Sequence, residues 1–142
     1  MAKVKIELPG EFIFKTEIPV RISDINYGGH LGNDSVLSIV HEARLRFLNR
    51  HNIIEFNANG PGIIMVDAAV EYKAESFYGD ILIVEIGAND ITGVGCEFVY
   101  RLTNKETKKI IALVKTGIVF YHYGKKKVIS MPVEFKSELE GD

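Results

Sequence analysis

The part of the chain with the greatest density of reactive side chains lies between residues 20 and 44. Five carboxylate, amide and imidazole groups fall within eleven residues there: Asp24, Asn26, His30, Asn33 and Asp34. Carboxylates and imidazoles can activate a water molecule or transfer a proton. A helical pattern begins directly afterwards, and a helix N-terminus carries unpaired N–H groups and a partial positive charge that can hold an oxyanion. The pattern therefore favours acid–base chemistry beside the start of a helix.

The same residues also fit a simpler interpretation, a glycine-rich turn that Asn33 or Asp34 caps. Two features favour a functional loop over this alternative. Ionisable and amide groups are dense in the stretch and stand beside strongly apolar segments, as in loops that carry function. In addition, the pair Gly28-Gly29 would let the backbone approach a ligand closely, because glycine has no side chain.

Apolar residues at helical spacing predict a long helix over residues 34–49. They form a broad arc, which indicates a central helix rather than a superficial one: Val36, Leu37, Ile39, Val40, Ala43, Phe47 and Leu48. Arg44 falls inside this arc when successive residues are placed about 100° apart. Because its guanidinium stays charged, Arg44 needs a carboxylate partner there, and Asp24 or another loop acid is the candidate. Such a pair either stabilises the fold or belongs to the site.

Period-two alternation predicts a strand over residues 11–22, in which Pro19 indicates an edge position or a bulge. A breaker-rich connection at 57–62 separates the helix from further predicted strands at 63–72, 81–91, 95–104, 109–121 and, as a short one, 128–131. Short turns between these strands make them antiparallel neighbours. A strand, a long apolar helix and a run of antiparallel strands together predict an α+β fold with one sheet around the helix.

The composition favours a small cytoplasmic protein and excludes several classes. The chain has 142 residues and is expected to form one domain over residues 1–142, with flexible termini at 1–10 and 137–142. A net charge of -2 gives no electrostatic case for nucleic acid. No apolar run approaches the roughly 20 residues that cross a bilayer, and no signal peptide is visible. Cys96 is the only cysteine, which excludes an intrachain disulfide and fits a reducing compartment.

No residue spacing in the chain is typical of a metal site or of a phosphate-binding glycine loop. The chain has four histidines, but no His-x3-His occurs, and His30 with Asp24 supplies too few ligands. We therefore expect neither a metal nor another cofactor. The basic run Lys125-Lys126-Lys127 is interpreted as a solvated hairpin turn, although it could also attract the phosphates of a nucleotide-bearing substrate.

Two groups of motifs resemble, in order and spacing, those of the hot-dog-fold acyl thioesterases, in the branch of the 4-hydroxybenzoyl-CoA thioesterases. The matching residues are Asp24, Asn26, Gly29-His30, Asn33 and Ala43-Arg44, followed downstream by Glu71-Tyr72 and Tyr78-Gly79-Asp80. The similarity spans about residues 15–133. It implies an α+β hot-dog fold, in which one antiparallel sheet of five or six strands wraps a long central helix. It also implies a homodimer or homotetramer with active sites between subunits.

This resemblance implies hydrolysis of an acyl thioester, carried by CoA or by acyl carrier protein, without a cofactor. The catalytic residues that it implies are Asp24, Asn26, His30 and Glu42, where Glu42 either faces a site across a subunit interface or is an exposed helix residue. The substrate-binding residues are Tyr27, Gly28, Gly29, Leu31, Gly32 and Asn33. Backbone N–H groups around residues 31–33 would polarise the thioester carbonyl.

Residue 26 departs from the family pattern, because the commonest acidic pair places a second carboxylate there. A neutral amide such as Asn26 serves neither as a general base nor as a carboxylate nucleophile. The chemistry therefore rests on Asp24, His30 or Glu42, or the site binds an acyl thioester without turnover. A hydratase or dehydratase that acts on an enoyl or β-hydroxyacyl thioester is a further alternative.

Overall fold

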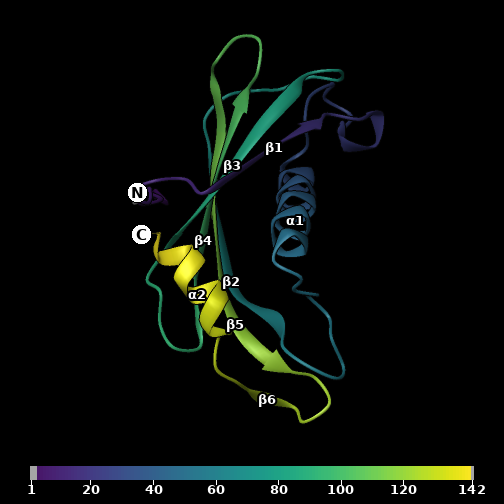
Figure 1. The fold of residues 1–142 in the computed structure, drawn as a ribbon. Coiled ribbons are helices and arrows are strands. Elements are labelled where there is room, and N and C mark those ends of the chain that lie inside the picture. The colour runs from purple at the N-terminus through teal and green to yellow at the C-terminus, as the bar shows by residue number, and fades with distance from the viewer. Residues whose placement is uncertain (1–2, 142) are drawn as a thin grey trace.

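One antiparallel sheet curves around a long helix in this protein (Figure 1). The computed structural model describes residues 3–141. Its elements follow one another in the order β1 (Phe14–Pro19), η1 (Ile22–Asp24, a 3-10 helix), α1 (Asn33–Arg50), β2 (Gly62–Tyr72), β3 (Ile81–Asn89), β4 (Gly95–Asn104), β5 (Ile110–His122), β6 (Lys127–Val128) and α2 (Val133–Glu140). This order confirms the predicted α+β layout.

The sheet has the strand order β1-β3-β4-β5-β2, with β6 paired to β5, and every neighbouring pair is antiparallel. The strands β3, β4 and β5 are successive neighbours because short turns join them. The connection through α1 carries the chain from β1 at one edge of the sheet to β2 at the other. Pro19 ends the edge strand β1, which confirms the edge position that its missing N–H group favours.

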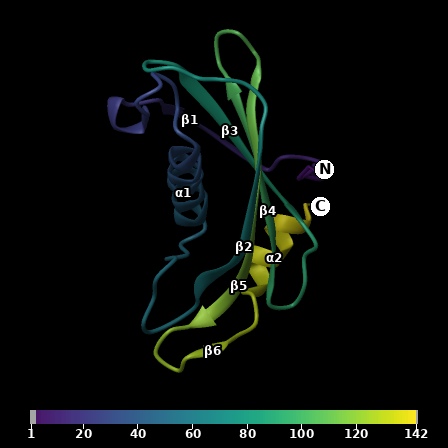
Figure 2. The same ribbon diagram turned by 180° about the vertical axis from the view of Figure 1, so that it is seen from behind.

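Helix α1 packs against the inner face of the sheet, as the front and back views both show (Figures 1 and 2). Alternate residues of each strand point to that face; those of β4 include Phe98, Tyr100 and Leu102. The helix contributes most of the predicted apolar arc, each member at most 2% exposed: Val36, Ile39, Val40, Ala43, Phe47 and Leu48. Leu37 is exposed instead. The apolar periodicity of residues 34–49 therefore identified the buried face of the helix.

The C-terminal segment forms a helix where the sequence analysis expected a polar, flexible tail over residues 137–142. Helix α2 buries Phe135 and Leu139, one turn apart, against the inner face. The ring of Phe135 lies 5.8 Å from that of Phe47 and 5.7 Å from that of Phe120. Two apolar residues in a short polar segment give a weak helical signal, and the aromatic cluster supplies the contacts that order it. Asp142 lies outside the described residues.

The other main difference from the predicted elements lies before α1. The strand predicted over residues 11–22 is shorter, since β1 covers Phe14–Pro19 and the chain then turns into η1. The segment before β1 crosses the outer face of the sheet, where Ile6 is buried with Val99 and Leu113. Of the N-terminal residues expected to be flexible, Met1 and Ala2 lie outside the described part. The four long strands after α1 agree with their predicted ranges to within two residues.

The structure places two further features of the sequence, the cysteine and the basic run. Cys96 is buried in the core, and its burial raises the pKa of the thiol to about 12, so the group is unreactive at neutral pH. The run Lys125-Lys126-Lys127 is exposed in the hairpin between β5 and β6, which confirms the predicted turn.

Candidate active site

Asp24 closes the base of the loop that connects β1 to α1. Its side chain is 4% exposed and accepts hydrogen bonds from the Arg21 backbone N–H at 2.8 Å and from the Arg21 guanidinium at 3.4 Å. The Asp24 backbone carbonyl accepts a hydrogen bond from the Gly32 N–H at 2.9 Å. These bonds join the two ends of the loop. The Asp24 carboxylate is therefore well placed to hold the loop in shape.

Asn26 organises the tight turn at the tip of this loop. Its side-chain oxygen Oδ1 accepts hydrogen bonds from the N–H groups of Gly28 at 2.9 Å and His30 at 3.4 Å. Its own N–H donates to the His30 carbonyl at 2.9 Å. Gly29 has φ of 88°, a conformation that glycine adopts without strain. Tyr27 is fully exposed at the tip. The amide at position 26 thus satisfies the backbone of the turn.

His30 follows this turn and faces a pocket. Its Nδ1 atom lies 3.3 Å from the Leu31 carbonyl oxygen. In the neutral ring this contact places the proton on Nδ1, which donates, and leaves the lone pair on Nε2. His30 therefore keeps a hydrogen-bond acceptor at Nε2, which lies beside Gly28 of the turn.

Helix α1 begins at Asn33, and no side chain in the described part of the chain caps it. Gly32 is the N-cap residue, and its carbonyl accepts hydrogen bonds from the Ser35 and Val36 N–H groups. Within residues 3–141, no acceptor is found for the N–H groups of Asn33 and Asp34. Unpaired N–H groups at this position carry the positive end of the helix dipole. The start of α1 consequently offers two N–H donors to an oxygen in the site, next to the Asp34 carboxylate of the first turn.

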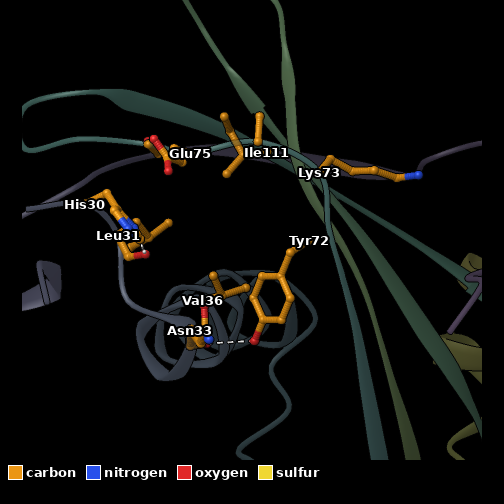
Figure 3. A pocket seen from close by; sticks show the side chains of 10 residues that line it. His30, Leu31, Asn33, Val36, Tyr72, Lys73, Glu75 and Ile111 are labelled. Atoms are coloured by element: carbon orange, nitrogen blue, oxygen red, sulfur yellow. Dashed lines mark hydrogen bonds between the residues drawn. The ribbon is translucent and has the colours of Figure 1, made fainter. Parts of the chain in front are cut away.

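A pocket of about 260 Å³ opens beside the start of α1 (Figure 3). Residues of the loop and of α1 form one wall: His30, Leu31, Asn33 and Val36. The segment at and after the end of β2 forms the other, with one residue of β5: Tyr72, Lys73, Ala74, Glu75, Ser76 and Ile111. Two hydrogen bonds join the walls, from the Leu31 N–H to the Ser76 carbonyl at 2.7 Å and from the Tyr72 hydroxyl to the Asn33 carbonyl at 3.1 Å.

Sequence reasoning did not identify the residues of the second wall as part of the site. Asp80 organises this wall, because its carboxylate accepts hydrogen bonds from the Ser76 hydroxyl at 2.8 Å and from the Phe77 N–H at 2.9 Å. Ser76 is 1% exposed. The motif Tyr78-Gly79-Asp80 was the available signal for this segment. It marked a turn correctly, but nothing local to it indicates that the turn contacts the loop before α1.

Glu42 lies away from the pocket in the protomer. Its exposed carboxylate accepts a hydrogen bond from Arg46 at 2.8 Å, and Arg46 also donates to Thr16 and to the Glu17 carbonyl on β1. Glu42 therefore faces the β1 edge, whereas the second wall of the pocket extends from β2 at the opposite edge. Its predicted catalytic role stays a prediction.

Arg44 forms the buried ion pair that its position on the helix predicts, and its partner is the loop acid Glu55 rather than Asp24. The guanidinium donates to the two Glu55 carboxylate oxygens at 3.1 and 3.3 Å and to the Tyr100 hydroxyl at 3.3 Å. Tyr100 in turn lies 2.7 Å from the Thr116 hydroxyl. Burial raises the pKa of Tyr100, while the charge of Arg44 opposes this shift. The network belongs to the core and does not line the pocket.

Within residues 3–141, no group of three or more His, Cys, Asp or Glu side chains is arranged to hold a metal ion. The helices of this part of the chain are also too short or too polar to cross a membrane.

The chain matches the family model of the thioesterase-like superfamily over residues 20–139 and belongs to that superfamily. Slr0204, a 1,4-dihydroxy-2-naphthoyl-CoA thioesterase from Synechocystis, has a similar structure, with a TM-score of 0.80 and 19% identity over 89% of this chain and 94% of that chain. The PA2801 protein from Pseudomonas aeruginosa has a TM-score of 0.82 and 19% identity, and covers 89% and 97% of the two chains. YbaW from Escherichia coli has a TM-score of 0.73 and 20% identity, with coverage of 89% and 96%.

The TM-scores of 0.73 to 0.82 establish the fold, and they confirm the predicted hot-dog architecture. No curated protein sequence matches this chain.

Proposed function

We propose that this protein hydrolyses an acyl thioester to a carboxylic acid and a free thiol, with CoA or acyl carrier protein as the carrier. The observation that carries the proposal is the start of α1, where the N–H groups of Asn33 and Asp34 have no acceptor among residues 3–141 and stand beside a pocket that His30 lines. The superfamily supports the reaction class. Slr0204, which acts on an aromatic acyl-CoA, shares the fold.

In the proposed mechanism the thioester carbonyl oxygen binds at the start of α1. As water adds to the carbonyl carbon, negative charge develops on this oxygen, and the helix N–H groups stabilise it. His30 contacts the attacking water through Nε2. Asp24 and Asn26 hold the loop and thereby position His30, and the glycines at 28, 29 and 32 let the acyl group approach the backbone. Cleavage of the C–S bond then releases the thiol.

The test of this function is release of free thiol from a panel of short, medium, long and aromatic acyl-CoAs, with an acyl carrier protein thioester alongside. We expect turnover of at least one substrate, and a fall in kcat of about 100-fold in His30→Ala, because the attacking water loses the side chain that orients it. His122→Ala, a histidine of β5 outside the pocket, is the matched control. Asp24→Ala and Glu42→Ala test the remaining predicted residues. No thiol release from any substrate would contradict the proposal.

Binding without turnover is the second candidate function, and the amide at position 26 favours it. Asn26 occupies the position of the family's second carboxylate and is engaged in the turn. A thermal shift with acyl-CoA but no thiol release would identify a binding protein.

The proposal includes pairing of two copies of the chain through β2. This strand is 11 residues long, lies at the edge of the sheet, and exposes the large apolar residues Met65, Val66 and Tyr72. A long edge strand with unpaired backbone groups is a template for pairing. Because the pocket starts at Tyr72, such a dimer brings the partner subunit close to the site.

The proposal also takes the protein to be cytoplasmic, which the free thiol of Cys96 fits.

Sedimentation equilibrium tests this dimer. We expect twice the mass of the chain for the wild type, and the mass of one chain for Ala68→Asp, which places a charge at an exposed position of the β2 edge. Ser137→Asp on the exposed side of α2 is the control and is expected to stay dimeric. A monomeric wild type, or a dimer that Ala68→Asp leaves intact, would contradict pairing through β2.

A further inference from the structure

The carboxylates around the pocket differ in whether other groups of the protein form hydrogen bonds or ion pairs with them. Asp24 is engaged by Arg21, Asp80 by Ser76 and Phe77, and Glu71 by Lys73 and by the Ile6 N–H. These bonds hold the three carboxylates in structural roles. By contrast, no hydrogen bond or ion pair within residues 3–141 engages the exposed side chains of Asp34 and Glu75, and of these two only Glu75 lines the pocket.

The structure also places Glu75 opposite His30. The two residues flank the hydrogen bond from the Leu31 N–H to the Ser76 carbonyl, which joins the two walls at 2.7 Å. Figure 3 shows the Glu75 carboxylate and the His30 ring on the two walls at the same end of the pocket, near Leu31. The Lys73 side chain extends away from them, toward its ion pair with Glu71. The Glu75 carboxylate is therefore not neutralised by this neighbouring ammonium group.

The backbone on both sides of Glu75 is held in place. The Lys73 and Ala74 N–H groups donate to the Ile111 carbonyl at 2.9 and 3.2 Å. On the other side, Ser76 is buried and bonded to Asp80. This fixed backbone keeps the Cα of Glu75 at a constant place relative to the start of α1, and from there the side chain reaches the pocket.

We propose that Glu75 is the general base of the thioester hydrolysis, a role that rests on the function proposed above. Its carboxylate supplies the negative charge that the amide of Asn26 lacks. It reaches the pocket from the segment after β2, whereas residue 26 belongs to the loop before α1. His30 and Glu75 then contact the attacking water from the two walls of one pocket.

In this arrangement Glu75 carries one proton from the water to the departing thiolate. A Glu75 oxygen takes one proton from the water while the water oxygen forms a bond to the carbonyl carbon. The resulting tetrahedral oxyanion is held by the N–H groups at the start of α1. When the oxyanion collapses, the C–S bond breaks and its electron pair leaves on sulfur. The protonated Glu75 returns the proton to the thiolate, so that a carboxylic acid and a thiol result.

The test compares wild-type protein with Glu75→Gln, which removes the charge and keeps the size of the side chain. The substrate is the acyl-CoA of the panel that the wild type hydrolyses fastest. We expect kcat to fall about 100-fold, as for loss of a general base, with KM and Tm essentially unchanged. Glu138→Gln, an exposed carboxylate on α2 without a described partner, is the matched control and is expected to keep wild-type kinetics.

The outcomes separate this role from the function itself. If the wild type turns over and Glu75→Gln keeps more than about a tenth of its kcat, thioester hydrolysis stands and Glu75 is not the base. If kcat is retained but KM rises, Glu75 binds the substrate and the assignment as base is overturned. A wild type that releases no thiol from any acyl-CoA overturns the function and the role of Glu75 together.

Discussion

Phe47→Ala is expected to lower the free energy of unfolding by about 4 kcal/mol, within the range for removal of a buried aromatic ring. The Phe47 ring lies 5.3 Å from Phe14, 5.8 Å from Phe98 and 5.8 Å from Phe135. It thus joins β1, β4 and α2 to the central helix. The substitution leaves a cavity at this junction and removes the contacts that hold α2. Urea unfolding followed by circular dichroism measures the loss.

Phe77→Ala is the matched control for this prediction. Its ring is exposed, so the same change of side chain is expected to lower stability by less than about 1 kcal/mol. We also expect faster amide hydrogen exchange in α2 for Phe47→Ala, because α2 depends on the aromatic cluster. A loss of stability in Phe47→Ala that is no larger than in Phe77→Ala would show that the aromatic cluster does not stabilise the fold.

Glu55→Ala is expected to lower the free energy of unfolding by about 3 kcal/mol, because it leaves a buried charge without its partner. The Arg44 side chain is 6% exposed, and Glu55 provides its carboxylate contacts. After the substitution, the guanidinium keeps its hydrogen bond to the Tyr100 hydroxyl but has no counter-charge in the network. Chemical denaturation of the purified variant measures the effect.

Replacing Arg44 is expected to lower the free energy of unfolding by less than replacing Glu55 does. Arg44→Met puts a flexible apolar chain into the core and leaves Glu55 partly exposed, where water solvates it and His41 lies 3.3 Å away. We expect a loss below about 1.5 kcal/mol, and little further loss in the double variant Arg44→Met/Glu55→Ala. Equal losses in the two single variants would contradict a cost that arises from the stranded Arg44 charge.

Much of the fold follows from local patterns in the sequence. The apolar arc of α1, the alternation in the strands and the turn residues between them each depend on neighbours a few residues away. Their predicted positions are accordingly close to those observed. Helix α2 is the exception, because Phe135 and Leu139 are ordered by contacts with Phe47 and Phe120, which are distant in the sequence.

The candidate site likewise has one part that the sequence predicted and one part that it did not. The sequence identified the loop from Asp24 to Asn33, whose polar groups and glycines are contiguous, and the structure shows that Asp24 and Asn26 support this loop from within. The second wall was not predicted. Nothing in the residues around Glu75 indicates a site, since its position opposite His30 depends on the hydrogen bond between Leu31 and Ser76.

The sequence by itself therefore determined helix α1 and the long strands, the buried face of the helix and the need of Arg44 for a carboxylate. Only the tertiary structure decided that this carboxylate is Glu55, that the start of α1 stays uncapped, and that Glu75 shares a pocket with His30. The physical reason is the range of the interactions. Periodicity and turn preference act between near neighbours, whereas the meeting of two distant side chains depends on the register of the sheet and the path of the chain across it.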